Sequence, residues 1–206
     1  KQKTAYEIRI RDWSQTCALP ISPIKGLHFM LRAMPEILKN YPDAHLYVAG
    51  NDLTKTDSLY GKLKISSFAK YIKRLISEYS LEEKVTFTGS LTEQKMKERF
   101  LKSNVFVSPS TIENSPNSLG EAMLLGVPCI SSDVGGVKNM LVHNLEGYIY
   151  QADAPYMIAY YVKKVFNDAD CALIISKNAK SHAEKTHNRD ENLKMLLKIY
   201  RELYEQ

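Results

Sequence analysis

Short apolar runs alternate with amphipathic stretches along most of this chain. Five runs have the length and composition of buried parallel strands, at residues 44–50, 85–89, 104–108, 127–131 and 147–150. Helical spacing of apolar residues predicts helices at 27–40, 68–79, 91–101, 116–126, 156–166, 171–186 and 192–204. Strands that alternate with helices predict an α/β fold with helices on both faces of a parallel sheet. Ligands of such sheets bind beyond the carboxyl ends of the strands, so functional residues are expected in those loops.

The loop and helix after residues 104–108 carry the densest set of candidate residues. Ser115 is a good N-cap residue, and Pro116 would then take the first helical position, where its missing N–H is harmless. The free amides of the first turn would point out of the helix N-terminus and suit a phosphate. These amides belong to Asn117, Ser118 and Leu119.

Two carboxylates flank this helix start, with seven residues between them. Glu113 lies in the loop, and Glu121 lies about one and a half turns inside the predicted helix. Both can face one crevice with the anion site between them. A sugar nucleotide needs one carboxylate for its ribose hydroxyls, dipoles for its diphosphate and a second carboxylate for its sugar hydroxyls. The alternative is a plain strand–helix unit with two solvated acids, because this spacing often occurs by chance.

Two further motifs favour the functional interpretation. Pro23-Ile24-Lys25-Gly26-Leu27 stands at the opening of the first predicted helix, and Gly120-Glu121-Ala122-Met123 is followed by Gly126-Val127-Pro128-Cys129-Ile130. Together with the two spaced glutamates, these segments resemble the C-terminal, donor-binding domain of the retaining GT-B glycosyltransferases of family 4, the glycosyl transferases group 1. The resemblance runs from about Pro23 to the C-terminus. It implies a Rossmann-like parallel sheet with helices on both faces.

The resemblance also implies a role for each matching residue. Lys25 would contact the donor diphosphate and Glu113 would lie by the donor sugar, so these two are the expected catalytic residues. Glu121 would hold the ribose hydroxyls. The other expected donor-binding residues are Asn117, Ser118 and Leu119 at the helix start, and Asn51 and Leu91 in the loops for the phosphate side and the base. The resemblance implies a nucleotide-diphosphate sugar as donor substrate, with positioned donors rather than a metal stabilising the departing diphosphate, and no cofactor.

Residues 1–22 do not fit this family pattern. A donor domain should open with an apolar strand and a Gly-Arg pair a few residues before Lys25, whereas Pro20 stands near the place of that arginine. The run from Arg11 to Ile21 shows neither β alternation nor a helical stripe, so we expect the opening strand to be missing. Residues 11–22 also look like the translation of a common sequencing-adapter oligonucleotide. We therefore assign 1–22 to an atypical segment, either non-native or a divergent linker, and 23–206 to the nucleotide-sugar-binding domain.

Composition narrows the class of protein. A chain of 206 residues, of which 44% are hydrophobic, suits one α/β domain. The net charge of +5 is modest and its lysines fall mostly on helix patterns, which indicates a solvated face. No nucleic-acid partner is expected, and contact with an anionic membrane surface is the minor alternative. Three cysteines without metal or disulfide spacing, no signal peptide and no long apolar span favour the cytoplasm, or the inner face of its membrane.

The family resemblance implies a larger enzyme. A GT-B enzyme has a second, N-terminal domain that binds the acceptor, and 206 residues leave no room for it. We therefore expect the donor-binding half of a transferase that moves a sugar to a glycan or lipid-linked acceptor, and we expect this chain alone to be inactive. A GT-B-fold sugar-nucleotide epimerase and a non-catalytic α/β binding module are the alternatives. Gly135-Gly136 fits either a close approach of backbone amides to a ligand or an ordinary tight turn.

Overall fold

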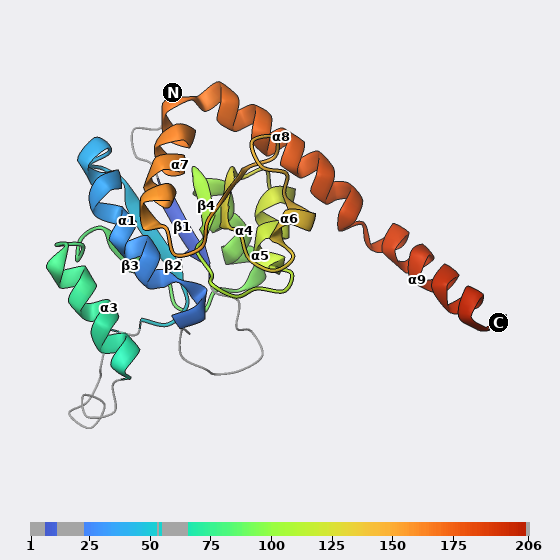
Figure 1. Cartoon of the computed structure of the whole chain (residues 1–206), viewed down its shortest axis with the longest axis horizontal. Helices are drawn as coiled ribbons and strands as arrows, with labels where there is room; N and C mark the ends of the chain where they lie inside the picture. Colours follow the sequence, from blue (N-terminus) through green and yellow to red (C-terminus); the bar gives the residue numbers. More distant parts are fainter. Residues whose placement is uncertain (1–6, 12–22, 53, 55–65, 205–206) are drawn as a thin grey trace.

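The computed structural model describes residues 7–11, 23–52, 54 and 66–204. Across these residues one parallel sheet has the strand order β3-β2-β1-β4-β5-β6. Its strands are β1 Glu7–Arg11, β2 His45–Ala49, β3 Val85–Phe87, β4 Val105–Ser108, β5 Cys129–Ser132 and β6 Tyr148–Tyr150. This is the strand order of the doubly wound dinucleotide-binding fold. The predicted Rossmann-like class is therefore confirmed (Figure 1).

The helices follow the predicted periodicity closely. They are the 3-10 turn η1 Pro23–Lys25, α1 Leu27–Asn40, α3 Ser67–Glu78, α4 Glu93–Lys102, α5 Asn117–Leu124, α6 Val137–Met140, α7 Pro155–Asn167, α8 Ala169–Thr186 and α9 Arg189–Tyr204. The short α6 was not predicted, because four residues are too few to show a period. Each predicted helix is present, and its first and last residues lie within three residues of the predicted ones.

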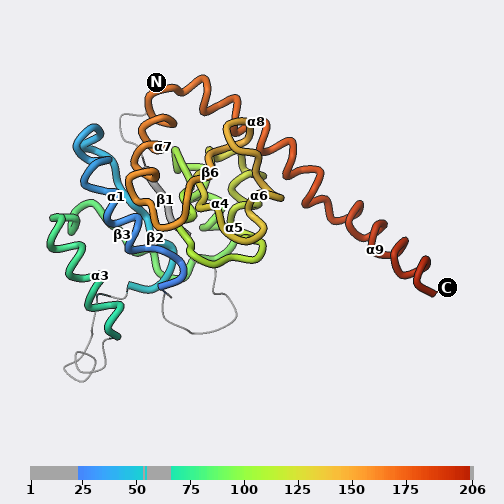
Figure 2. Tube along the Cα trace, viewed as in Figure 1, coloured from blue at the N-terminus to red at the C-terminus, as the bar shows by residue number. Residues whose placement is uncertain are grey.

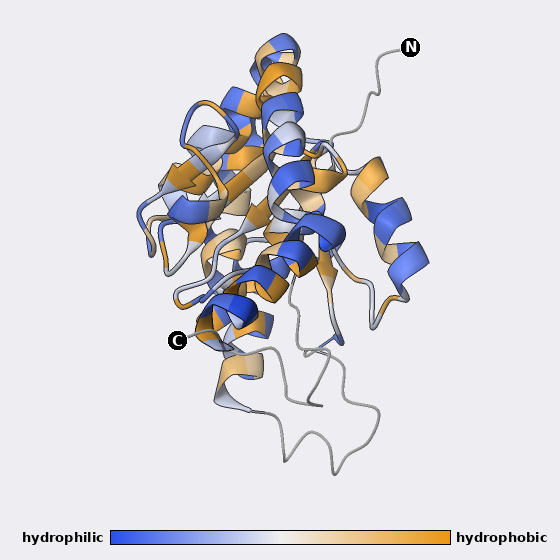
Figure 3. Ribbon diagram, turned by 90° about the vertical axis from the view of Figure 1, so that its right-hand side faces the viewer, coloured by the Kyte–Doolittle hydropathy of each residue, from blue (hydrophilic) through white to orange (hydrophobic). Residues whose placement is uncertain are grey.

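The alternation of side chains along the strands divides the core into two layers. In β4, Val105 and Val107 join one buried cluster and Phe106 joins the other. The first cluster lies under α1, α3 and α7, and the second under α4, α5 and α6. Helix α8 contributes Ala172 and Ile175 to the first layer and Ala179 and Ala183 to the second. Apolar residues gather between the helices and the strands in Figure 3, and helices cover both faces of the sheet.

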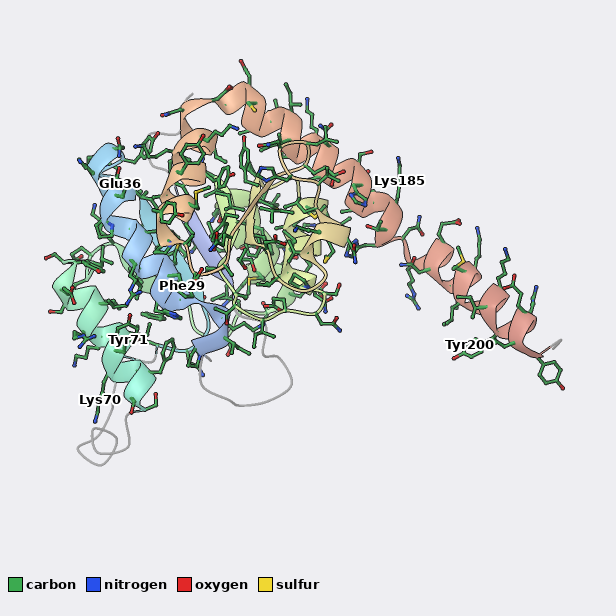
Figure 4. The ribbon with its side chains drawn as sticks, viewed as in Figure 1. Phe29, Glu36, Lys70, Tyr71, Lys185 and Tyr200 are labelled. Atoms are coloured by element: carbon green, nitrogen blue, oxygen red, sulfur yellow. The ribbon has the colours of Figure 1, made fainter. Side chains whose placement is uncertain are left out.

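A ring cluster packs α3 against α1. The His28 ring lies 4.0 Å from that of Phe29, 5.8 Å from that of Phe68 and 6.1 Å from that of Tyr71, measured between centroids. Figure 4 labels Phe29 on α1 and Tyr71 on α3, and both pack against the first core cluster. Burial and the positive charge of Arg32 lower the pKa of His28, so this histidine stays neutral within the ring cluster near pH 7.

The expectation of a missing opening strand is wrong. Glu7–Arg11 forms β1 at the centre of the sheet, where Ile8 pairs with Leu46 of β2 and with Val105 of β4. The run from Arg11 to Ile21 lacks a strand pattern, but the strand ends where that run begins, in the alternating segment Glu-Ile-Arg-Ile-Arg. A strand between β2 and β4 satisfies backbone groups on both neighbouring edges. The atypical run at 12–22 lies outside the described residues.

Helix α9 extends away from the rest of the molecule in Figures 1 and 2. Every residue of this helix is exposed, and Tyr200, which Figure 4 labels, keeps 63% of its surface accessible. Leu193, Leu196 and Leu197 are exposed on the same helix. Among the described helices, α9 included, none combines the length and the apolar character needed to span a membrane.

A part-buried hydrogen bond between the backbone and a histidine side chain predicts how stability depends on pH. His143 Nδ1 accepts a hydrogen bond from the Ile149 N–H at 2.9 Å, which ties the loop after α6 to β6. Burial and the charge of Lys164 lower the pKa of His143 from its usual value near 6.5. A group whose pKa is lowered in the folded protein contributes stability that is fully present above its unfolded pKa and is lost as the pH falls through the folded pKa. We therefore expect the free energy of unfolding to fall between pH 7 and pH 5.

The variant His143→Asn isolates this effect, since an amide oxygen can accept the same hydrogen bond without titrating. Denaturant unfolding at pH 7, 6 and 5 should show a steeper loss of stability in the wild type than in His143→Asn. His28 is common to both proteins and cancels in the comparison. Equal pH dependence in the two proteins would contradict the assignment.

Candidate functional site

The strand order reverses between β1 and β4, and this reversal places the candidate site. In open parallel sheets, ligands bind outside the carboxyl ends of the strands at such a point. The chain after β1 leads to η1, which ends at Lys25, and the chain after β4 leads into the loop that holds Glu113. The two expected catalytic residues thus lie on the two chain segments that leave the sheet where the strand order reverses, one after β1 and one after β4.

Lys25 and Glu113 form a direct ion pair. Lys25 Nζ lies 2.8 Å from Glu113 Oε1, although the two residues are 88 positions apart in the sequence. Their side chains are only 21% and 13% exposed. Beside the ion pair, the Thr111 N–H donates to the Ile24 carbonyl oxygen at 2.7 Å. The structure therefore brings together the two residues that the sequence motifs single out, and a backbone hydrogen bond fixes the same two segments.

Gly26 permits this close approach. It precedes α1 with φ of 73°, in the left-handed region that side chains other than glycine rarely adopt. A Cβ atom added there would collide with the backbone carbonyl of Pro109, at the start of the Glu113 loop. The glycine after Lys25 is required because α1 begins against the backbone that follows β4.

Two buried serines hold the Glu113 loop, and the sequence analysis gave neither a role. Ser110 Oγ donates to Glu113 Oε1 at 2.8 Å. Ser132 Oγ, at the end of β5, donates to the Ser110 carbonyl oxygen at 2.5 Å. Their exposed fractions are 3% and 0%. A serine three residues before a glutamate is too common a pattern to predict the bond from Ser110 to Glu113. The bond from Ser132 to Ser110 joins the end of β5 to the loop after β4, and no sequence pattern predicts it.

Helix α5 begins differently from the prediction. Asn117 is its first residue, and Pro116, not Ser115, occupies the N-cap position, without a side-chain cap. Ser115 Oγ instead lies 3.4 Å from Met140 Sδ. The backbone ahead of the helix is set by packing against the turn after β5, where the Gly136 N–H donates to the Asn114 carbonyl oxygen at 2.7 Å. This contact holds the backbone two residues ahead of the N-cap.

The same contact explains the pair Gly135-Gly136. Gly135 has φ of 51°, and a Cβ atom there would collide with the Glu113 carbonyl oxygen. The Gly136 amide is already bonded inside the protein, so it is not a free donor for a ligand. The two glycines form a tight turn that packs directly against the Glu113 loop.

The first turn of α5 contains two amides suited to an anion. The Leu119 N–H donates to the Pro116 carbonyl oxygen at 2.9 Å, and the Leu119 side chain is buried in the second core layer. Within the described part of the chain, the amides of Asn117 and Ser118 have no backbone acceptor. Glu121 lies in the next turn and is half-buried. The roles of these four residues toward a donor stay predictions.

Asn51 and Leu91 lie on loops that the structure joins. The amides and carbonyls of Gly50 and Gly89 exchange two hydrogen bonds, of 3.2 and 3.0 Å, so the loops after β2 and β3 run side by side. Asn51 is exposed, whereas Leu91 is half-buried and packs against the second core layer. Both loops lie at the carboxyl edge of the sheet, and the donor contacts proposed for them also stay predictions.

Metal-binding side chains do not gather in the part of the chain that the structure describes. No group of three or more His, Cys, Asp or Glu residues in that part lies close enough together to hold a metal ion. Cys129, which lies in an apolar run, is fully buried in the second core layer, and this burial raises the pKa of its thiol.

Comparison with known proteins identifies the family. The model of the glycosyl transferases group 1 matches residues 20–182. The chain belongs to this family. An uncharacterized glycosyltransferase of Methanocaldococcus jannaschii is 27% identical over 177 residues, which are 86% of this chain and 42% of that protein. The chain spans less than half the length of this and other curated relatives that it matches.

Solved structures share the fold of this group 1 chain. Sucrose-phosphate synthase from Thermosynechococcus elongatus superposes with a TM-score of 0.78 at 22% identity, over 98% of this chain and 47% of that one. HepE of Anabaena, solved in complex with UDP-glucose, gives a TM-score of 0.72 at 20% identity, over 88% of this chain and 44% of that one. Both place the described fold among GT-B glycosyltransferase domains.

The close contact at Gly26 can be tested with a matched pair of variants. Gly26→Ala should destabilise the protein by more than the roughly 1–2 kcal/mol of a left-handed alanine, because its Cβ would also strike the Pro109 carbonyl. Gly89→Ala is the control, since Gly89 has a similar φ of 67° and no atom within 4 Å of an added Cβ. Urea unfolding of both variants measures the difference. Equal destabilisation of the two variants would show that the contact between the added Cβ atom and Pro109 does not contribute to the loss of stability.

Proposed function

We propose that this chain is the donor-binding part of a retaining, family 4 glycosyltransferase. It would move a sugar from a nucleotide-diphosphate sugar to a glycan or lipid-linked acceptor. The observation that carries the proposal is the Lys25–Glu113 pair at the reversal of strand order, beside the N-terminus of α5. A donor there has a cation and helix amides for its diphosphate and a carboxylate for its sugar. The UDP-glucose complex of HepE, a structural neighbour, supports a nucleotide sugar as the ligand.

Each residue then has a distinct task. Lys25 and the amides of Asn117 and Ser118 offset the negative charge that grows on the departing diphosphate. Glu113 accepts hydrogen bonds from hydroxyls of the donor sugar, and Glu121 accepts them from the ribose. In a retaining transfer the diphosphate leaves and the acceptor hydroxyl attacks on the same face of the sugar. The charge on the leaving group is therefore what the site has to stabilise, and we propose that it does so without a metal.

Transfer also needs a bound acceptor. Much of the rate of a two-substrate reaction comes from holding both reactants in attack geometry. Because the chain spans less than half of its curated relatives, we propose that the acceptor is bound by the remaining part of the longer protein. The chain alone then binds a donor and transfers nothing. We propose the cytoplasm, or the inner face of its membrane, as the place of the full protein.

An epimerase of the same fold would share the nucleotide contacts. The match to the glycosyl transferases group 1 favours the transferase. A failure of the intact chain to bind any sugar nucleotide would favour a non-catalytic module instead. Product analysis with a labelled sugar nucleotide separates the two enzymes.

Substitution of the two glutamates tests the division of tasks. Glu121→Ala should weaken binding of free nucleotide and sugar nucleotide alike by about 1–3 kcal/mol, since a hydrogen bond from ribose to a charged group is lost. Glu113→Ala should leave free nucleotide nearly unaffected and weaken only the sugar-bearing donor. Calorimetry with UDP-, GDP- and ADP-linked sugars and the free nucleotides measures both effects. Glu98→Ala, on the surface of α4, is the control. An equal loss of free nucleotide in both variants would refute the division.

A chelator tests the proposed charge stabilisation. Affinity for the sugar nucleotide should change by less than about twofold when EDTA is added, because Lys25 and the α5 amides supply the positive charge. The same titration with added Mg²⁺ should give the same result. A strict Mg²⁺ requirement would count against a metal-independent donor site.

A further inference from the structure

One oxygen of Glu113 receives two hydrogen bonds. Lys25 Nζ and Ser110 Oγ each lie 2.8 Å from Oε1. Among the described residues nothing donates to Oε2, which leaves that oxygen available to a sugar hydroxyl. Under the proposed function, on which this inference rests, Lys25 has to serve a diphosphate as well. A lysine that turns to the diphosphate weakens its bond to Glu113, and the contact with Ser110 then remains.

Ser110 is well placed for that task because its own position is fixed. Its side chain is 3% exposed, and its carbonyl oxygen accepts the 2.5 Å hydrogen bond from Ser132 Oγ. The backbone ladder between β4 and β5 ends where Ser108 pairs with Ser131. Ser132, which is fully buried, continues the link between the two strands by side chain, since its hydroxyl also lies 3.4 Å from the Ser108 carbonyl oxygen. The Glu113 loop cannot move away from β5 without losing the hydrogen bonds made by the Ser132 hydroxyl.

The other side of the loop is fixed independently of Lys25. The Thr111 N–H and hydroxyl both donate to the Ile24 carbonyl oxygen, at 2.7 and 3.2 Å. The segment that carries the Ser110 hydroxyl is thus anchored to the end of β5 on one side and to η1 on the other, while the lysine side chain retains its rotatable bonds. Ser110 is the rigid donor to Glu113, and Lys25 is the adaptable one.

We propose that Ser110 is a positioning residue of the donor site and that Ser132 positions Ser110. Together they keep the Glu113 carboxylate turned toward the donor sugar when Lys25 engages the diphosphate. The contribution of Ser110 therefore concerns only ligands that carry a sugar. Neither serine touches the nucleotide.

The test compares a sugar nucleotide with its free nucleotide. UDP-glucose and UDP are the first probes, followed by GDP- and ADP-linked sugars with GDP and ADP, in calorimetry on the purified chain. Ser110→Ala should weaken the sugar nucleotide on the order of tenfold and free nucleotide less than about twofold, since a hydrogen bond to a charged group is lost. Ser110→Thr, which keeps the hydroxyl, should restore most of the selectivity. Ser132→Ala should act in the same direction with a smaller loss.

Two further variants separate positioning from a general loss of structure. Ser176→Ala removes another buried serine hydroxyl, which donates to the Leu173 carbonyl on α8, and should change neither affinity. In a Glu113→Gln background, Ser110→Ala should cause little additional loss, because the two residues act through one contact. If Ser110→Ala does not fold, Ser132→Ala and Ser110→Thr carry the comparison.

The possible results distinguish a failure of the proposed function from a failure of the inference about Ser110. A wild-type chain that binds none of the sugar nucleotides would overturn the proposed function and this inference with it. A wild type that binds, with a Ser110→Ala variant that loses both ligands equally or loses neither, would overturn the inference alone. Additive losses from Ser110→Ala and Glu113→Gln would also overturn it.

Discussion

The ion pair between Lys25 and Glu113 is the contact on which the arrangement of the site depends. It closes the point where the strand order reverses, between the chain after β1 and the chain after β4. Each partner is mostly buried, so each charge needs the other, or a ligand that replaces it. Around the pair, Gly26 lets α1 begin against Pro109, and the bond from Thr111 to Ile24 fixes the two backbones. Under the proposed function, a donor diphosphate would bind beside this ion pair, where the positive charge of Lys25 is already held in place.

The loops at this edge of the sheet are held by contacts that replace the strand ladder. Beyond the last paired residues of β4 and β5, the side chain of Ser132 and the amide of Gly136 continue the hydrogen bonding to Ser110 and Asn114. The bond from Ser132 satisfies the carbonyl of Ser110, a residue that is only 3% exposed, and the bond from Gly136 holds the more exposed backbone of Asn114. The glycine turn at 135–136 and the two serines are therefore as much a part of the site as its charged residues.

The centre of the sheet lies outside the segment that matches the family. The family match covers residues 20–182, whereas β1 at Glu7–Arg11 pairs with both β2 and β4. A gap between two parallel strands leaves two rows of backbone groups unpaired, so any five residues that can extend there gain hydrogen bonds on both sides. Backbone pairing at this place needs only a segment that can extend, so β1 forms although residues 1–22 lack the opening pattern expected of the family.

The sequence by itself determined the class of fold and most helices and strands, and its motifs singled out Lys25 and Glu113, which the structure pairs, because periodicity and short motifs are local properties of a chain. It failed for β1, whose place depends on the open edges of β2 and β4, and it placed the start of α5 one residue too early. It also missed Ser110 and Ser132. Ser110 lies three residues before Glu113, in a pattern too common to reveal a contact, and Ser132 lies 22 residues from Ser110. Only the tertiary structure decided that Ser110 bonds Glu113 and Ser132 bonds Ser110, because a hydrogen bond between distant segments leaves no pattern along either one.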